Sequence, residues 1–100
     1  MDTNFLLLAE KIRDQLVSWR RKIHQHPELG FQEHKTSALI ARNLEGFGLD
    51  LQTEVGKTGV VGRLGSGRPA IGLRAEMDAL TIQEANEVPY VSQIPGVMHA

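Results

Sequence analysis

The sequence predicts an α/β fold in which two helices precede a mixed sheet that contains a β-hairpin. In the first half, apolar residues recur at every third or fourth position, as they do along one face of a helix. In the second half, short segments alternate apolar and polar residues, which is typical of strands. Sheets of α/β domains are usually covered on both faces, and here only one layer of helices is available. The predicted domain is therefore incomplete.

The first helix is expected to begin after the capping candidates Asp2, Thr3 and Asn4 and to end before Pro27. Side-chain oxygens of this kind accept hydrogen bonds from the free amides of a first turn, and a residue before proline disfavours the helical conformation. One apolar stripe follows a helical spacing: Leu8, Ile12, Leu16, Trp19 and Ile23.

A second helix is predicted from Phe31 to Glu45, because another apolar stripe follows there and glycines end it. The segment Leu49–Val55 then alternates as a half-buried strand. The segments Val60–Leu64 and Ala70–Ala75 read as two further strands, joined into a hairpin by the turn sequence GSGRP. This string also matches a dinucleotide-binding fingerprint, but a strand follows it where a helix is required.

The composition is that of a globular protein, with 41% hydrophobic and 23% charged residues. A net charge of -1 gives no general attraction to nucleic acid or to an anionic membrane. The absence of cysteine excludes disulfides and thiolate metal ligands within these residues. The longest apolar run, Phe5–Ala9, is too short to span a membrane, and no secretory leader precedes it. A cytoplasmic protein is expected.

The densest polar cluster is the segment Trp19–Glu28. Its basic residues 20–22 form either a nucleic-acid patch or, as the neutral charge of the chain favours, a solvated helix face. His24 and His26 are either metal ligands or histidines that interact with the free carbonyls of a helix end. Residues two apart on a helix point about 200° apart, which favours the second interpretation.

Two carboxylates follow the last predicted strand, Glu76 and Asp78. Side chains two apart on a strand point to the same side, and sites in α/β folds gather at the carboxyl ends of strands. Two like charges this close require a cation, so the pair indicates either a metal site or a solvated strand end with Arg74 as partner. The spacing alone leaves both open.

Four stretches in this order resemble a known family: WRRKIHQHPELGFQE, KTGVVGRLGSG, IGLRAEMDAL and PGVMHA. The family comprises the metal-dependent amidohydrolases that act on N-acyl amino acids, hippurate and auxin conjugates, which are relatives of zinc aminoacylases and carboxypeptidases. The resemblance implies that residues 1–100 are the N-terminal portion of a zinc-peptidase-like catalytic domain. It also implies that the chain is truncated and lacks the smaller dimerisation domain through which a full-length parent would form a homodimer.

The resemblance implies that the parent hydrolyses the amide bond of N-acyl amino acids or similar small amides with two divalent ions, zinc, manganese or similar. The first ligands belong to a Cys-Gly-His-Asp sequence expected directly after Ala100, so no metal or cofactor ligand is expected within the chain. The fragment is accordingly expected to be inactive and to bind no metal. Asp78 is the single catalytic-site residue carried over, as a carboxylate that orients a ligand or tunes the metal.

Three residues have no assigned role in this comparison. Glu76 stands where the amidohydrolases usually have Asp, and Thr81 replaces a usual proline, which removes a constraint on the turn. His99 is implied to lie near the site without being a ligand. The alternative to an enzyme fragment is a non-catalytic interaction module that uses the exposed sheet and helices.

Overall fold

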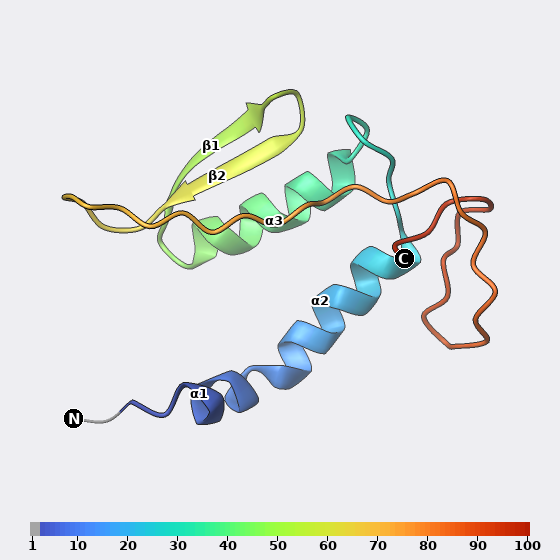
Figure 1. The fold of residues 1–100 in the computed structure, drawn as a ribbon, viewed down its shortest axis with the longest axis horizontal. Coiled ribbons are helices and arrows are strands. Elements are labelled where there is room, and N and C mark those ends of the chain that lie inside the picture. Colours follow the sequence, from blue (N-terminus) through green and yellow to red (C-terminus); the bar gives the residue numbers. More distant parts are fainter. Residues whose placement is uncertain (1–2) are drawn as a thin grey trace.

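The computed structural model describes residues 3–100, so the capping candidate Asp2 lies outside the described part. Three helices precede one hairpin: α1 (Phe5–Lys11), α2 (Arg13–Gln25), α3 (His34–Gly46), β1 (Asp50–Val55) and β2 (Gly59–Arg63). Figure 1 shows α1 and α2 as one bent rod, with α3 and the hairpin forming a second body beside it. The remaining residues run without helix or strand from the hairpin back to the end of α2.

The predicted first helix is interrupted at Ile12. Its backbone angles, φ -107° and ψ 9°, leave the helical region, and its N–H bonds to the carbonyls of Ala9 and Glu10. The expected cap at Asn4 is confirmed, because its side-chain oxygen accepts a hydrogen bond of 3.1 Å from the N–H of Leu7. The apolar stripe is largely exposed, and the packing that would keep one straight helix against a core is missing from the described residues.

Helix α3 begins three residues later than predicted, since Phe31 has a positive φ of 65° and cannot belong to a right-handed helix. The carboxylate of Glu28 lies beside the start of α3 and accepts hydrogen bonds from the N–H groups of Lys35 (3.0 Å) and Thr36 (2.7 Å). Burial raises the pKa of Glu28, but these bonds and the Thr36 hydroxyl outweigh it and hold the pKa below its usual value. A residue outside the helix therefore caps it.

The predicted hairpin is wrong in its second strand. The hairpin forms between β1 and β2, which pair antiparallel with Leu51 opposite Gly62. The chain reverses through Gly56 and Lys57, both with positive φ, whereas the residues after β2 turn back without pairing with it (Figure 1). Segment 70–75 is extended but unpaired, so within residues 3–100 the sheet is two-stranded and antiparallel rather than mixed.

The described residues contain little core. Ala79, 3% exposed, is the one buried hydrophobic residue among them. The hairpin packs on α3 through Gly62, where an added Cβ would lie 2.9 Å from a methyl group of Leu49 and 3.3 Å from one of Leu44. By contrast, Ile71 and Leu73 are 92% and 99% exposed. No helix in residues 3–100 is long and apolar enough to cross a membrane.

Backbone hydrogen bonds fasten the irregular segment after residue 78 to the end of α2. The N–H of Ala79 donates to the carbonyl of Glu28 at 2.8 Å, and the N–H of Gln93 donates to that of Gln25 at 2.9 Å. Leu80 and Met98 exchange two hydrogen bonds, of 2.9 and 3.0 Å, as an antiparallel pair. This pairing brings the neighbours Asp78 and His99 to the same end of the molecule.

Candidate functional site

Asp78 and Glu76 are exposed and lie just before Leu80, the residue that pairs with Met98. The side chain of Glu76 forms an ion pair of 3.3 Å with Arg74, and both groups are largely in solvent. Asp78 is also exposed and acts electrostatically on His99. Among residues 3–100, no three His, Cys, Asp or Glu side chains gather closely enough to hold a metal ion.

His99 is half-buried, and its Nε2 atom is shielded from solvent with no hydrogen-bond partner among the described residues. Burial lowers the pKa of this imidazole, and the charge of His24 lowers it further. The carboxylate of Asp78 acts in the opposite direction, but the pKa stays below its usual value. The imidazole is therefore neutral at pH 7, and its inward nitrogen is free to meet a group from outside the described residues.

A partly buried hydrogen-bonded pair joins α2 to the irregular segment. The Nε2 atom of His24 lies 2.9 and 3.0 Å from the two carboxylate oxygens of Glu84, whose side chain is 1% exposed. Since a carboxylate only accepts hydrogen bonds, this nitrogen carries the proton. The expectation that His24 interacts with helix-end carbonyls is thus wrong for this atom, because Glu84 is a stronger, charged acceptor.

Two further groups donate to Glu84: the N–H of Ser92 at 2.6 Å and the side-chain amide of Asn86 at 3.1 Å. The Ser92 N–H, followed by His24, is the main reason that the pKa of Glu84 falls below its usual value. The ring of Tyr90 stands edge-on to His24, with centroids 6.0 Å apart. Sequence reasoning missed this cluster, because its partners are sixty positions apart and no local pattern connects them.

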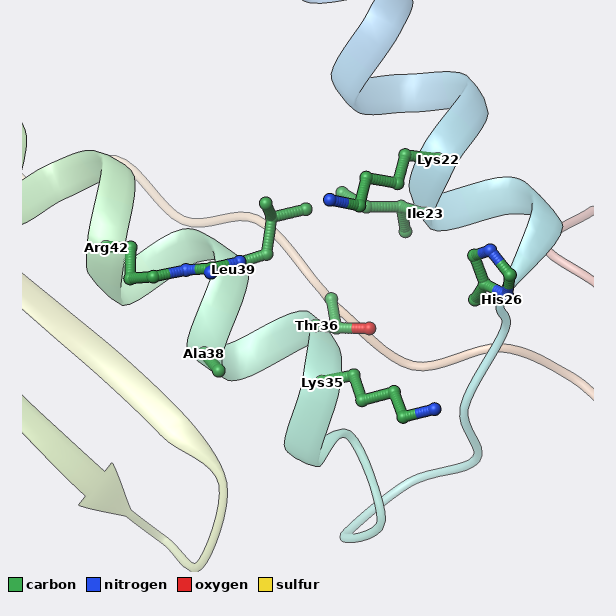
Figure 2. Close-up of a pocket in the computed structure, with 8 residues that line it drawn as sticks. All are labelled: Lys22, Ile23, His26, Lys35, Thr36, Ala38, Leu39 and Arg42. Atoms are coloured by element: carbon green, nitrogen blue, oxygen red, sulfur yellow. The ribbon is translucent and has the colours of Figure 1, made fainter.

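His26 belongs to a different place, a groove of about 430 Å³ between α2 and α3. Figure 2 shows Lys22 and Ile23 on α2 facing Leu39 and Thr36 on α3 across this groove, with His26 at one end. Its charged lining is basic and comes from Lys22, Lys35 and Arg42. Neither Asp78, Glu84 nor His99 lines it, so the groove is separate from the candidate site.

No protein-family model matches the chain. It is 48% identical to IAA-amino acid hydrolase ILR1-like 5 of Arabidopsis thaliana, over 97% of the chain and 23% of that protein. It is 52% identical to hippurate hydrolase of Campylobacter jejuni, over 81% and 22% respectively. With N-acyl-L-amino acid amidohydrolase of Geobacillus stearothermophilus it shares 44% identity, over 93% and 26%.

The fold also matches solved structures. The chain superposes on the YXEP protein of Bacillus subtilis, a dinuclear metal-binding peptidase of the M20 family, with a TM-score of 0.80 and 39% identity. The match covers 90% of this chain and 26% of that one. A structure from methicillin-resistant Staphylococcus aureus matches with a TM-score of 0.84 and 37% identity, over 96% and 26%.

Over most of its own length, the chain is similar to one part of an M20 dinuclear metal-binding peptidase and of amidohydrolases of N-acyl amino acids. It spans about a quarter of the length of these relatives. The zinc-peptidase-like α/β fold expected from the sequence is thereby confirmed as a partial domain.

The described residues do not by themselves fit the two-metal centre that this family implies. Asp78 and His99 offer one oxygen and one nitrogen donor at the same end of the chain, and both suit divalent ions. A closed or catalytic site needs at least three protein ligands, and no such group exists within residues 3–100. The ligands of a metal centre therefore have to come from elsewhere in the fold.

Proposed function

We propose that this chain is part of a metal-dependent amidohydrolase that cleaves the amide bond of small N-acyl amino acids. The observation that carries the proposal is the identity of 44–52% to three relatives whose names share this one type of bond. Bound divalent ions supply Lewis-acid activation of a carbonyl and of water in such reactions. The acyl group and the amino acid of the substrate are left open.

Within the proposed enzyme, Asp78 lies beside the metal centre and orients or tunes it without being a ligand. Its exposure supports this role, because the carboxylate is accessible to groups from the rest of the fold. Its electrostatic effect on His99 also supports it, since a second polar side chain faces the same end. The centre holds two divalent ions, with zinc or manganese as the proposed metals, and the 100 residues alone are inactive.

Three further properties remain proposals from the sequence. The protein is cytoplasmic, it forms a homodimer through a domain outside this chain, and it binds neither nucleic acid nor membranes. The net charge of -1 supports the last of these.

A graft tests the proposed function directly. The 100 residues replace the matching quarter of the Bacillus subtilis peptidase, which shares 39% identity over that region. We expect the graft to bind two zinc or manganese ions, counted by elemental analysis, and to release glycine from hippurate. A folded graft that binds the metals but hydrolyses neither hippurate nor other N-acyl amino acids contradicts the proposal.

Substitution of Asp78 tests its role within the graft. Asp78→Asn removes the charge but keeps the shape, and we expect the metal affinity or kcat/KM to fall about 10- to 100-fold, as for partners of metal ligands. Asp14→Asn on the exposed face of α2 is the matched control and should leave both unchanged. Equal behaviour of the two variants would remove Asp78 from the site.

A further inference from the structure

The buried carboxylate of Glu84 is the most heavily hydrogen-bonded side chain of the irregular segment. His24, Ser92 and Asn86 all donate to it, at distances between 2.6 and 3.1 Å. A carboxylate that is 1% exposed is unfavourable unless its oxygens are paired in this way. The segment around it therefore adopts one conformation, in which all these donors converge.

From Glu84 a chain of hydrogen bonds continues to the candidate site. Ser92, whose N–H binds Glu84, donates through its hydroxyl to the carbonyl of Val97 at 2.7 Å. The next residue, Met98, forms the two-bond pair with Leu80. Asp78 and His99 lie just outside that pair, so the path connects the hydrogen-bonded pair of His24 and Glu84 to both residues.

A second contact holds the same turn from the other side. The side-chain oxygen of Gln83, which precedes Glu84, accepts a hydrogen bond of 2.6 Å from the N–H of Gly96. Gly96 has a positive φ of 75°, a backbone conformation that residues with a side chain rarely adopt. The turn before His99 is thus fixed at both Ser92 and Gly96.

We infer that Glu84, held by His24, is a positioning residue that fixes the turn 92–98 and with it the relative placement of Asp78 and His99. This inference rests on the proposed function, because it assigns the pair to the same amide-hydrolysing site. Glu84 touches neither substrate nor metal in this role. It acts through Ser92 and the Leu80–Met98 pair. These contacts fix the position of the buried Nε2 atom of His99.

The test uses Glu84→Gln in the graft, with Glu87→Gln as the control. Glu87 is an exposed carboxylate three positions away and makes no ion pair among the described residues. We expect Glu84→Gln to lower kcat by about tenfold or more while KM stays within about twofold, at a temperature where both variants are fully folded. The control should keep kcat within about twofold. If Glu84→Gln lowers the melting temperature but leaves kcat unchanged, the residue is merely structural and the inference is overturned.

If Glu84→Gln does not fold, Ser92→Ala tests the same inference. It preserves the backbone N–H bond to Glu84 and removes the bonds of the hydroxyl to the carbonyl of Val97 and to the backbone of Ile94. We expect a smaller but clear fall in kcat, about threefold to tenfold. An unchanged kcat would show that the hydrogen-bond path carries no positioning, which overturns the inference.

The NMR signal of the His99 imidazole separates this inference from the proposed function. The signal is expected to shift in Glu84→Gln and to stay in place in Glu87→Gln, whether or not the graft is active. An inactive graft with this pattern contradicts the proposed function but supports the positioning by Glu84. An active graft in which neither substitution moves the His99 signal keeps the proposed function and overturns the positioning.

Discussion

Two regions of the chain lack regular secondary structure, and they differ in what holds them. Residues 79–98 are tied to the end of α2 and to one another by backbone bonds and by the buried Glu84 carboxylate. Residues 64–77 bend once and then run without a strand partner, all of them except Met77 are exposed, and their one side-chain ion pair, Arg74 with Glu76, lies in solvent. Residues 79–98 thus have a fixed conformation without helix or strand, whereas residues 64–77 lack partners that would hold them.

The kind of residue explains the difference. The held region is rich in polar groups that find partners within a few positions, such as Ser92 with Val97. The exposed region places apolar residues, Ile71 and Leu73, at alternating positions. Such side chains stabilise a fold only when another surface covers them. The chain spans about a quarter of its relatives, and we propose that the remainder of such a fold supplies this surface.

The largest expected effect concerns Leu73. In the graft, where the rest of the fold covers this residue, Leu73→Ala should lower the free energy of unfolding by about 3 kcal/mol, as for a buried leucine. In the 100-residue chain, where Leu73 is 99% exposed, the same change should stay within about 0.5 kcal/mol. Denaturant unfolding of each Leu73→Ala variant and its parent measures these changes in the free energy of unfolding. If the free energy of the graft does not change, the segment is solvated in the complete fold.

Hydrogen exchange of the 100-residue chain compares the two regions directly. The amides of Leu80, Gln93 and Met98 donate to backbone carbonyls and should exchange at least about tenfold more slowly than those of unstructured peptides. The amides of residues 71–75 should exchange at the unstructured rate. Equal rates in the two regions would remove the distinction between them.

A smaller effect is expected at Glu28, whose carboxylate caps α3 and whose carbonyl holds Ala79. Glu28→Gln should lower the free energy of unfolding by about 1 kcal/mol, the usual contribution of a cap. The carbonyl bond to Ala79 is kept, so the exchange rate of that amide should change little. Thermal unfolding measures the free energy, and hydrogen exchange measures the Ala79 amide. Faster exchange of this amide in Glu28→Gln would show that the cap of α3 and the segment after residue 78 are coupled.

The same residue gives a pH dependence. The pKa of Glu28 is lower in the folded chain than in the unfolded one, so its stabilising contribution is fully present above the unfolded value. It is lost as the pH falls through the lowered, folded pKa. Melting temperatures of the natural chain and of Glu28→Gln should therefore converge in acid, and a constant difference down to low pH would contradict the cap.

The helices and the first strand could be predicted because their signals are local. The cap at Asn4 and the alternation of β1 depend on neighbours within a few positions. The break at Ile12 could not be predicted, since the apolar stripe continues through it. The wrong hairpin followed from two turn-like sequences on either side of β2, of which only the first joins two paired strands.

The candidate site was less predictable than the fold. The acidic pair after residue 75 is visible in the sequence, but the role of Asp78 came from resemblance and stays a prediction. Glu84 and His24 meet across sixty positions, so only the folded chain reveals them. The environment of His99 likewise depends on burial and on two distant charged groups.

The unpaired segment 70–75 has a consequence for the behaviour of this chain at high concentration. Its unpaired N–H and C=O groups form an open edge, and the apolar side chains of Ile71 and Leu73 are exposed beside it. We expect two copies to pair along this edge, because each added copy offers a new one. We therefore expect the isolated chain to aggregate strand by strand, and a charge placed at position 71 or 73 to interrupt this.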